Sequence, residues 1–217
     1  MNRFDFHDRA FAISLAALAG YIDAIGFLAT SGFFVSFMSG NTTRLGVGLG
    51  AGTSEAGVAA RLIFLFVGGV ALGTLIGAHA GKWRRCAILL VISGVIALGA
   101  AFGLAGRAGP AAMALAVGMG MVNTVLGGGE ARIGLTYMTG TLVKIGEGIA
   151  GMISGHKTLE WLPNLLLWGG LMSGGWAGAA AYGNWGARCL WAGVFAALLL
   201  AAAGAAVVWA RPQAGQR

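Results

Sequence analysis

Polar residues and a cation interrupt an apolar run at two places in the chain, 100 residues apart. The first copy spans residues 35–49 (VSFMSGNTTRLGVGL) and the second spans residues 135–149 (LTYMTGTLVKIGEGI). The copies align without a gap, and Arg44 of the first corresponds to Lys144 of the second. An unpaired charge at the centre of a bilayer costs at least ~3 kcal/mol. A cation at the matching position of both copies therefore favours a functional role for Arg44 and Lys144.

These residue types predict a site for a small anion or a carboxylate at the interface of the two copies. Gly40 and Gly140 permit a break in each helix. A half-helix that restarts near Arg44 exposes free N–H groups and the positive end of its dipole. The predicted binding residues are Ser39, Gly40, Asn41, Thr42, Arg44, Thr139, Gly140, Thr141 and Lys144. The alternative is that the Ser, Thr and Gly residues only let helices pack closely.

Three further residues are candidates for ion coupling or charge balance. Asp23 lies deep in the first apolar segment, and Asn123 holds the matching place in the second half. Asp23 is either a protonatable coupling site or a counter-ion of Arg44 or Lys144, and the two roles are compatible. Glu147 follows Lys144 by three residues on the same helical face, so these two side chains are expected to pair.

The composition predicts a membrane protein. Of the 217 residues, 58% are hydrophobic and 10% are charged, and the mean hydropathy is +0.81. Soluble domains carry roughly 25% charged residues. The net charge of +7 does not indicate nucleic-acid binding, because the cations stand singly or in short flanks of apolar segments.

The sequence gives little sign of catalysis. It contains no His-Glu-x-x-His motif and no Gly-x-Ser-Gly motif, and its two cysteines lack metal-ligand spacing. We therefore expect neither an enzyme nor a metal or other cofactor.

Six apolar segments are long enough to cross a bilayer, which takes about 20 residues. They cover about 10–29, 61–81, 86–105, 110–128, 162–182 and 189–210. The duplicated stretches add two interrupted segments, at about 33–51 and 133–152. The predicted fold is an all-α polytopic membrane protein with a single membrane domain over residues 1–217. Its internal repeats cover residues 1–106 and 107–217, each with a helix, an interrupted segment and two further helices.

Two glycine ladders also match between the halves and predict close helix packing. Their members are Gly69, Gly73 and Gly77 in the first half and Gly170, Gly174 and Gly178 in the second.

The distribution of cations favours re-entrant duplicated segments and inverted repeats. If these segments do not cross the membrane, nine loop cations lie in the cytoplasm and three lie outside. The nine are Arg3, Arg9, Lys82, Arg84, Arg85, Arg132, Lys157, Arg211 and Arg217, and the three are Arg61, Arg107 and Arg188. The alternative, eight spans in parallel repeats, puts five inside and seven outside. The positive-inside rule thus selects six spans with both termini cytoplasmic, and it places Cys86 and Cys189 at opposite membrane faces.

Two motifs carry a resemblance to a known family. They are the run Gly20-Tyr21-Ile22-Asp23-Ala24 and the later run Met38-Ser39-Gly40-Asn41. With these motifs the chain resembles the YoaK-like family of bacterial inner-membrane proteins of unknown function, over nearly its whole length. The resemblance implies a polytopic protein of the bacterial inner membrane and supplies no substrate.

Together these features predict a secondary transporter or channel for a small, anionic or carboxylate-bearing solute. The expected partners are the lipid bilayer and that solute, with no nucleic acid, and a homo-oligomer is left open. The alternative function is a non-transporting scaffold or assembly factor that recruits a partner helix to its glycine ladders.

Overall fold

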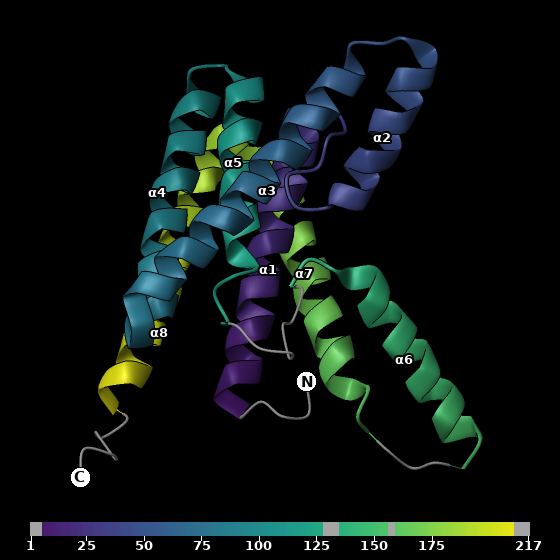
Figure 1. Cartoon of the computed structure of the whole chain (residues 1–217), viewed down its shortest axis with the longest axis vertical. Helices are drawn as coiled ribbons and strands as arrows, with labels where there is room; N and C mark the ends of the chain where they lie inside the picture. Colours follow the sequence, from purple (N-terminus) through teal and green to yellow (C-terminus); the bar gives the residue numbers. More distant parts are fainter. Residues whose placement is uncertain (1–5, 128–134, 156–158, 211–217) are drawn as a thin grey trace.

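The computed structural model describes residues 6–127, 135–155 and 159–210 (Figure 1). Within these ranges the chain forms eight α-helices and two short 3₁₀-helices and has no β-strand. The helices are α1 Phe6–Ala29, α2 Met38–Ala51, α3 Glu55–Ala80, η1 Gly81–Trp83, α4 Arg84–Leu104, α5 Ala108–Val122, α6 Met138–Ile153, α7 Leu162–Trp185, η2 Gly186–Cys189 and α8 Leu190–Ala210. The prediction of an all-α fold is confirmed.

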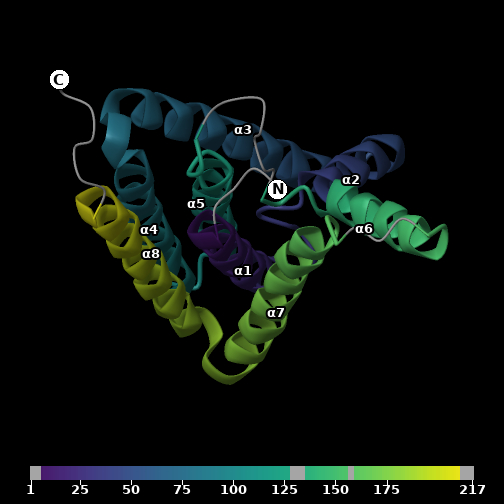
Figure 2. The ribbon, with the colours of Figure 1, turned by 90° about the horizontal axis from the view of Figure 1, so that it is seen from below.

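Two glycines with positive φ form the sharp turns of the chain. Gly81 (φ 51°) ends α3 and Gly186 (φ 53°) ends α7. Glycine adopts this left-handed region without the steric cost that a Cβ atom brings. The chain can therefore change direction within a few residues. After the first turn α4 packs on α3, whereas after the second α8 leads away from α7 and packs along α4 (Figure 2).

Three apolar stretches of the described residues are long enough to cross a membrane. They are Asp8–Ala29, Glu55–Leu104 and Leu162–Ala210, and α5 is a shorter apolar helix. The second stretch comprises α3 and α4, and the third comprises α7 and α8, each with its turn glycine between the two helices.

The main bundle is built by helices that pack across the two halves of the chain. α1 packs along α7, α5 packs along α3, and α4 packs along α8 (Figures 1 and 2). Ile13 of α1 meets Gly170 of α7, and two turns later Tyr21 meets Gly178, so these helices run in the same direction. α3 and α5 also run parallel to each other, and Figure 1 shows them running opposite to α1 and α7.

Glycines allow the two crossed-over pairs to approach closely. A Cβ atom on Gly20 of α1 would overlap the carbonyl oxygen of Leu171, and one on Gly120 of α5 would overlap that of Phe66. Any larger residue at either position must push the backbones apart. The two contacts are equivalent, since Gly20 and Gly120 are matching repeat positions.

The two glycine ladders match each other between the halves, but one helical turn away from the predicted alignment, which pairs Gly69 with Gly170. Gly69 meets Val117 of α5, and Gly174 meets Ala17 of α1. Because these two contacts are equivalent, Gly69 corresponds to Gly174 and not to Gly170. Each ladder repeats every four residues, so a shift of one turn still aligns glycine with glycine, and sequence alone does not fix the register.

The short helices α2 and α6 lie outside the main bundle, on the same side of it (Figures 1 and 2). α2 packs on α3 and α6 packs on α7. Both begin near the middle of the long axis and run toward opposite ends (Figure 1). Residues 30–37 return from the end of α1 to this middle level without regular helix.

The predicted position of the chain break is wrong. The sequence places the break at Gly40 and Gly140 with a restart near Arg44, yet both glycines lie in the first turn of α2 and α6. A Cβ atom on Gly40 would crowd the ring of Phe37, and one on Gly140 would crowd the ring of Tyr137. The glycines therefore make room for an aromatic ring over the start of each helix.

We expect Gly174→Ala to destabilise the protein, because its new methyl group meets the backbone of Ala17. Overpacking of this kind costs about 1–3 kcal/mol. Gly169→Ala is the matched control on the same helix, since a Cβ there meets nothing within 4 Å. The control should be neutral or slightly stabilising, because Ala is the better helix former. Thermal unfolding in detergent micelles checks this, and equal midpoints for the two variants would contradict the packing described.

Candidate functional site

The carboxylate of Asp23 joins α1 to the segment that leads into α2. Its Oδ1 accepts hydrogen bonds from the backbone N–H groups of Val35 (2.8 Å) and Ser36 (2.7 Å). Both donors lie just before α2, so the acid stands at the positive end of the α2 dipole. In the first half, the protein's own carboxylate thus occupies the place predicted for a bound anion.

Asn41 holds the same segment from within α2. Its side-chain oxygen accepts a hydrogen bond from the N–H of Phe34 (3.1 Å), and its Nδ2 donates to the Phe34 carbonyl (2.7 Å). The residue is 0% exposed. Asn41 therefore satisfies backbone groups of Phe34 that have no helical partner.

The second half repeats this arrangement with a neutral residue and longer hydrogen bonds. Oδ1 of Asn123 accepts from both the N–H and the hydroxyl of Thr136, each at 3.3 Å, and Nδ2 donates to the Met119 carbonyl at 3.1 Å. The Thr141 hydroxyl donates to the Tyr137 carbonyl at 3.4 Å. None of the hydrogen bonds described at the start of α6 is accepted by a carboxylate.

Arg44 pairs with Glu55 and not with Asp23. Its Nη1 lies 3.8 Å from Oε2 of Glu55, and its guanidinium carbon lies 4.4 Å from the centre of the Phe33 ring. The prediction that Asp23 is the counter-ion of Arg44 is wrong. The reason is geometric: α2 carries Arg44 away from Asp23 toward the start of α3, while Asp23 is bonded to backbone N–H groups.

Lys144 and Glu147 are both exposed on α6. Neither forms an ion pair with the residues that the structure describes. The expected pairing of Lys144 with Glu147 is therefore absent, and Lys144 does not pair with Asp23.

None of the predicted binding residues lines either of the two cavities described below. Two are buried at the helix starts, two are covered by aromatic rings, one pairs with Glu55, and the rest are exposed on the outer faces of α2 and α6. In that order they are Asn41 and Thr141, Gly40 and Gly140, Arg44, and finally Ser39, Thr42, Thr139 and Lys144.

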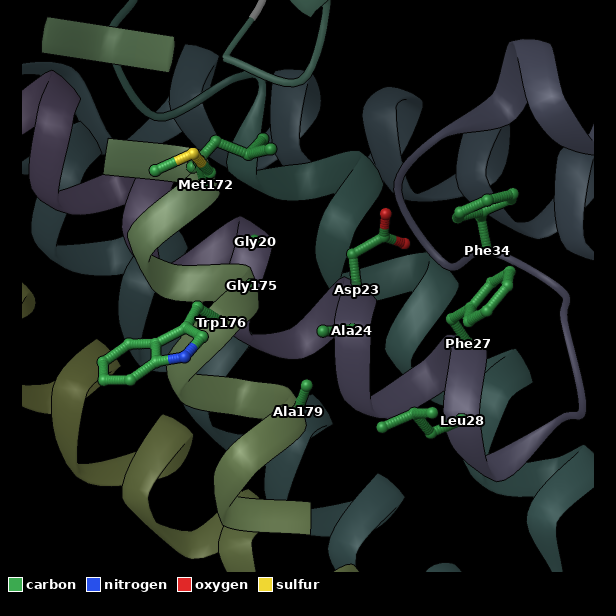
Figure 3. A pocket seen from close by; sticks show the side chains of 11 residues that line it. Gly20, Asp23, Ala24, Phe27, Leu28, Phe34, Met172, Gly175, Trp176 and Ala179 are labelled. Carbon is green, nitrogen blue, oxygen red and sulfur yellow. The ribbon is translucent and has the colours of Figure 1, made fainter. Parts of the chain in front are cut away.

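A cavity of about 320 Å³ opens between α1 and α7 beside Asp23 (Figure 3). Phe27, Phe34, Met172 and Trp176 supply most of its apolar wall, and Asp23 is the charged residue of its lining. Figure 3 shows the Asp23 carboxylate directed toward the segment that carries Phe34. Phe27, Phe34 and Trp176 become neighbours only when α1 packs on α7, so the sequence alone does not show that they meet beside Asp23.

A second cavity, of about 210 Å³, lies among the end of α1, the turn between α4 and α5, and the turn that joins α7 to α8. Its lining includes Ile25, Leu115, Tyr182 and Leu190 and carries no charged residue. It offers no group that would orient an ionic solute.

We expect Asp23→Ala to lower the stability strongly, because it removes the acceptor of two backbone N–H groups. An unsatisfied buried donor costs roughly 1–3 kcal/mol. Asp23→Asn should cost less, since the amide oxygen can still accept, as Asn123 does in the second half. Asn123→Ala is the matched control and should cost less than Asp23→Ala, because its bonds are longer. Thermal unfolding in detergent ranks the midpoints of these variants. An Asp23→Ala variant as stable as the wild type would show that this carboxylate does not hold the segment before α2 in place.

The comparisons with known proteins agree with a membrane-embedded chain. A family model described as "Protein of unknown function (DUF1275)" matches residues 11–203. UPF0700 transmembrane protein RA0705 of Rhizobium meliloti (strain 1021) is 35% identical over 196 residues, which cover 89% of this chain and 84% of that protein. No solved structure matches the chain. The chain therefore belongs to the DUF1275 family of membrane proteins, consistent with the resemblance carried by its Gly-x-x-Asp-Ala and Met-Ser-Gly-Asn motifs.

Proposed function

We propose that this protein is a secondary transporter or channel for a small solute, with a pathway beside the starts of α2 and α6. One observation carries the proposal: two short helices begin at the middle level and run toward opposite ends (Figure 1). Non-helical backbone at membrane depth is tolerated only where protein buries it or where it lines a water-filled cavity. Half-helices of this kind recur at the substrate sites of transporters built from inverted repeats. The proposed role includes no catalysis and no cofactor.

The proposed topology has six spans, formed by α1, α3, α4, α5, α7 and α8. In it, α2 and α6 are re-entrant and the repeats 1–106 and 107–217 are inverted. The opposite directions of α1 and α5, and of α4 and α8, support inversion (Figure 1). The cation distribution supports cytoplasmic termini in a bacterial inner membrane.

The solute that we propose is an anion or a carboxylate, bound at the start of α6. In the first half, the carboxylate of Asp23 stands before α2. The matching residue at α6 is the neutral Asn123, and Lys144 lies less than two turns into that helix. An external carboxylate at α6 would take the place that Asp23 takes at α2, with Lys144 as the nearby cation.

The scaffold alternative loses the feature on which it depends. Gly69 and Gly73 contact α5, and Gly174 and Gly178 contact α1. These glycines are covered by the chain's own helices, so they offer no open groove to a partner.

The topology predicts that the turns η1 and η2 lie at opposite membrane faces, as do Cys86 and Cys189. Because Cys189 is only 3% exposed, the exposed positions Lys82 and Arg188 are the sharper probes. In a background with Cys86→Ser and Cys189→Ser, an impermeant maleimide added to intact spheroplasts should label Arg188→Cys. Lys82→Cys should react only after permeabilisation. Labelling of both from one side would reject inverted repeats.

A thermal-shift screen of inorganic anions and small carboxylates on purified protein tests the proposed function. A ligand at 100 times its Kd stabilises the folded form by about 2.7 kcal/mol. We expect at least one such anion to stabilise the wild type and to be transported into proteoliposomes.

Two variants should lose this response for different reasons. Lys144→Gln removes the nearby cation, and Asn123→Asp supplies a carboxylate that fills the site as Asp23 does in the first half. Lys82→Gln, on an exposed turn, is the control and should respond like the wild type. A screen in which no anion stabilises the protein, or in which Asn123→Asp still responds, would refute the anion site at α6.

A further inference from the structure

The outer faces of α2 and α6 carry polar and charged side chains among exposed apolar ones. Ser39, Thr42 and Thr43 are exposed on α2, and Lys144 and Glu147 are exposed on α6. Both helices lie on the same side of the bundle (Figures 1 and 2). Within the described structure, this side therefore combines hydroxyls with two charges of opposite sign.

The other outward faces have the composition that lipid tails require. Phe64 on α3 is 82% exposed and Leu199 on α8 is 72% exposed, and further large apolar side chains are exposed on α4 and α7. Charged side chains facing hydrocarbon are costly and rarely face lipid. The charged part of the face formed by α2 and α6, at Lys144 and Glu147, therefore needs a partner other than lipid tails.

This face also has the shape for close contact with another helix. Thr42, Gly46 and Gly50 follow one another every four residues on α2. A Cβ atom on Gly46 or Gly50 would meet nothing within 4 Å. Small residues at this spacing allow helices to approach closely in a membrane, and here, unlike at Gly174, the chain supplies no helix to fill the space.

We propose that a second copy of this chain covers the face, giving a homodimer that meets through α2 and α6. The charges on α6 favour a second copy over another partner. Lys144 and Glu147 lie on one helical face, have opposite signs and are not paired with each other. A two-fold axis brings residue i against residue j and residue j against residue i. Each Lys144 then meets Glu147 of the second copy, and both charges are satisfied.

This inference goes beyond the proposed transport function, and the two give Lys144 different partners: the solute in transport and Glu147 of the second copy in the dimer. Crosslinking through Val47→Cys and Val143→Cys tests the dimer without changing Lys144, and anion uptake by the wild type tests transport whether or not the dimer forms.

Disulfide crosslinking in native membranes tests the contact. In the background with Cys86→Ser and Cys189→Ser, the single-cysteine variants Val47→Cys and Val143→Cys are placed on the face; these valines are 66% and 54% exposed. Phe64→Cys is the matched control on a lipid-facing helix. We expect a covalent dimer from the first two variants, at least tenfold more than from the control. Crosslinking at Phe64→Cys alone, or at none of the three with a monomeric mass in detergent, overturns the proposal.

A charge exchange between two copies tests the pairing itself. Lys144→Glu gives a face with two acids, and Glu147→Lys gives a face with two cations. Each variant alone sets like charges against each other, which costs several kcal/mol at an interface. We expect the Val143→Cys crosslink to fall at least tenfold in either variant.

Co-expression of the two variants with different tags should restore a mixed dimer, because their faces are complementary. If Lys144 and Glu147 paired only within one α6, mixing the two variants would not restore the crosslink. Wild-type crosslinking in each variant alone, or no mixed dimer when both are correctly folded, overturns the pairing. Retention of the helical circular dichroism signal shows that each variant folds.

Discussion

The structure depends on satisfying the backbone groups of a segment that is not helical. Residues 30–37 leave the end of α1 and return to the middle of the molecule. In hydrocarbon, each backbone N–H or C=O without a partner costs several kcal/mol. Asp23 and Asn41 supply partners from both sides of the segment, and Asp23 places its charge at the start of α2. These hydrogen bonds, together with the packing of α2 on α3, hold α2 in its position.

The two halves use one geometry with different chemistry. Met38 and Met138 each donate a backbone hydrogen bond of 3.1 Å to the residue two positions earlier, so the chain enters both short helices in the same way. The acid before α2 is an amide before α6, and its hydrogen bonds are longer there. The duplicated sequence accounts for the shared path of the backbone. Because a carboxylate stands before α2 and a neutral amide before α6, the two helix starts differ in how they would attract an ion.

Sequence periodicity and composition predicted the helices well, because apolar length and glycine spacing are local properties. Each predicted segment contains a helix, although α5 ends at Val122, earlier than expected. Two features depend on contacts that the sequence does not display. The break precedes Gly40, because Asp23 and Asn41 stabilise residues 30–37. The ladder register depends on which turn of α1 meets Gly174.

The candidate site was harder to predict than the fold. The residue types were recognised, but their partners were not, because partners come from other elements. Arg44 meets Glu55 at the start of α3, and Asp23 meets backbone N–H groups. The cavity beside Asp23 needs Trp176 from α7. Long-range packing, which a single sequence does not encode in a readable way, decides all three.

The pairing of α1 with α7 has a consequence for how the protein is made. About 130 residues separate the end of α1 from the start of α7. At the usual pace of protein synthesis, of 5–20 residues per second, α1 waits on the order of 10 s for its neighbour. During that time the surface around Gly20 lacks the helix that covers it in the finished bundle. Completion of the bundle therefore belongs to the last stage of synthesis, when α7 and α8 take their places along α1 and α4.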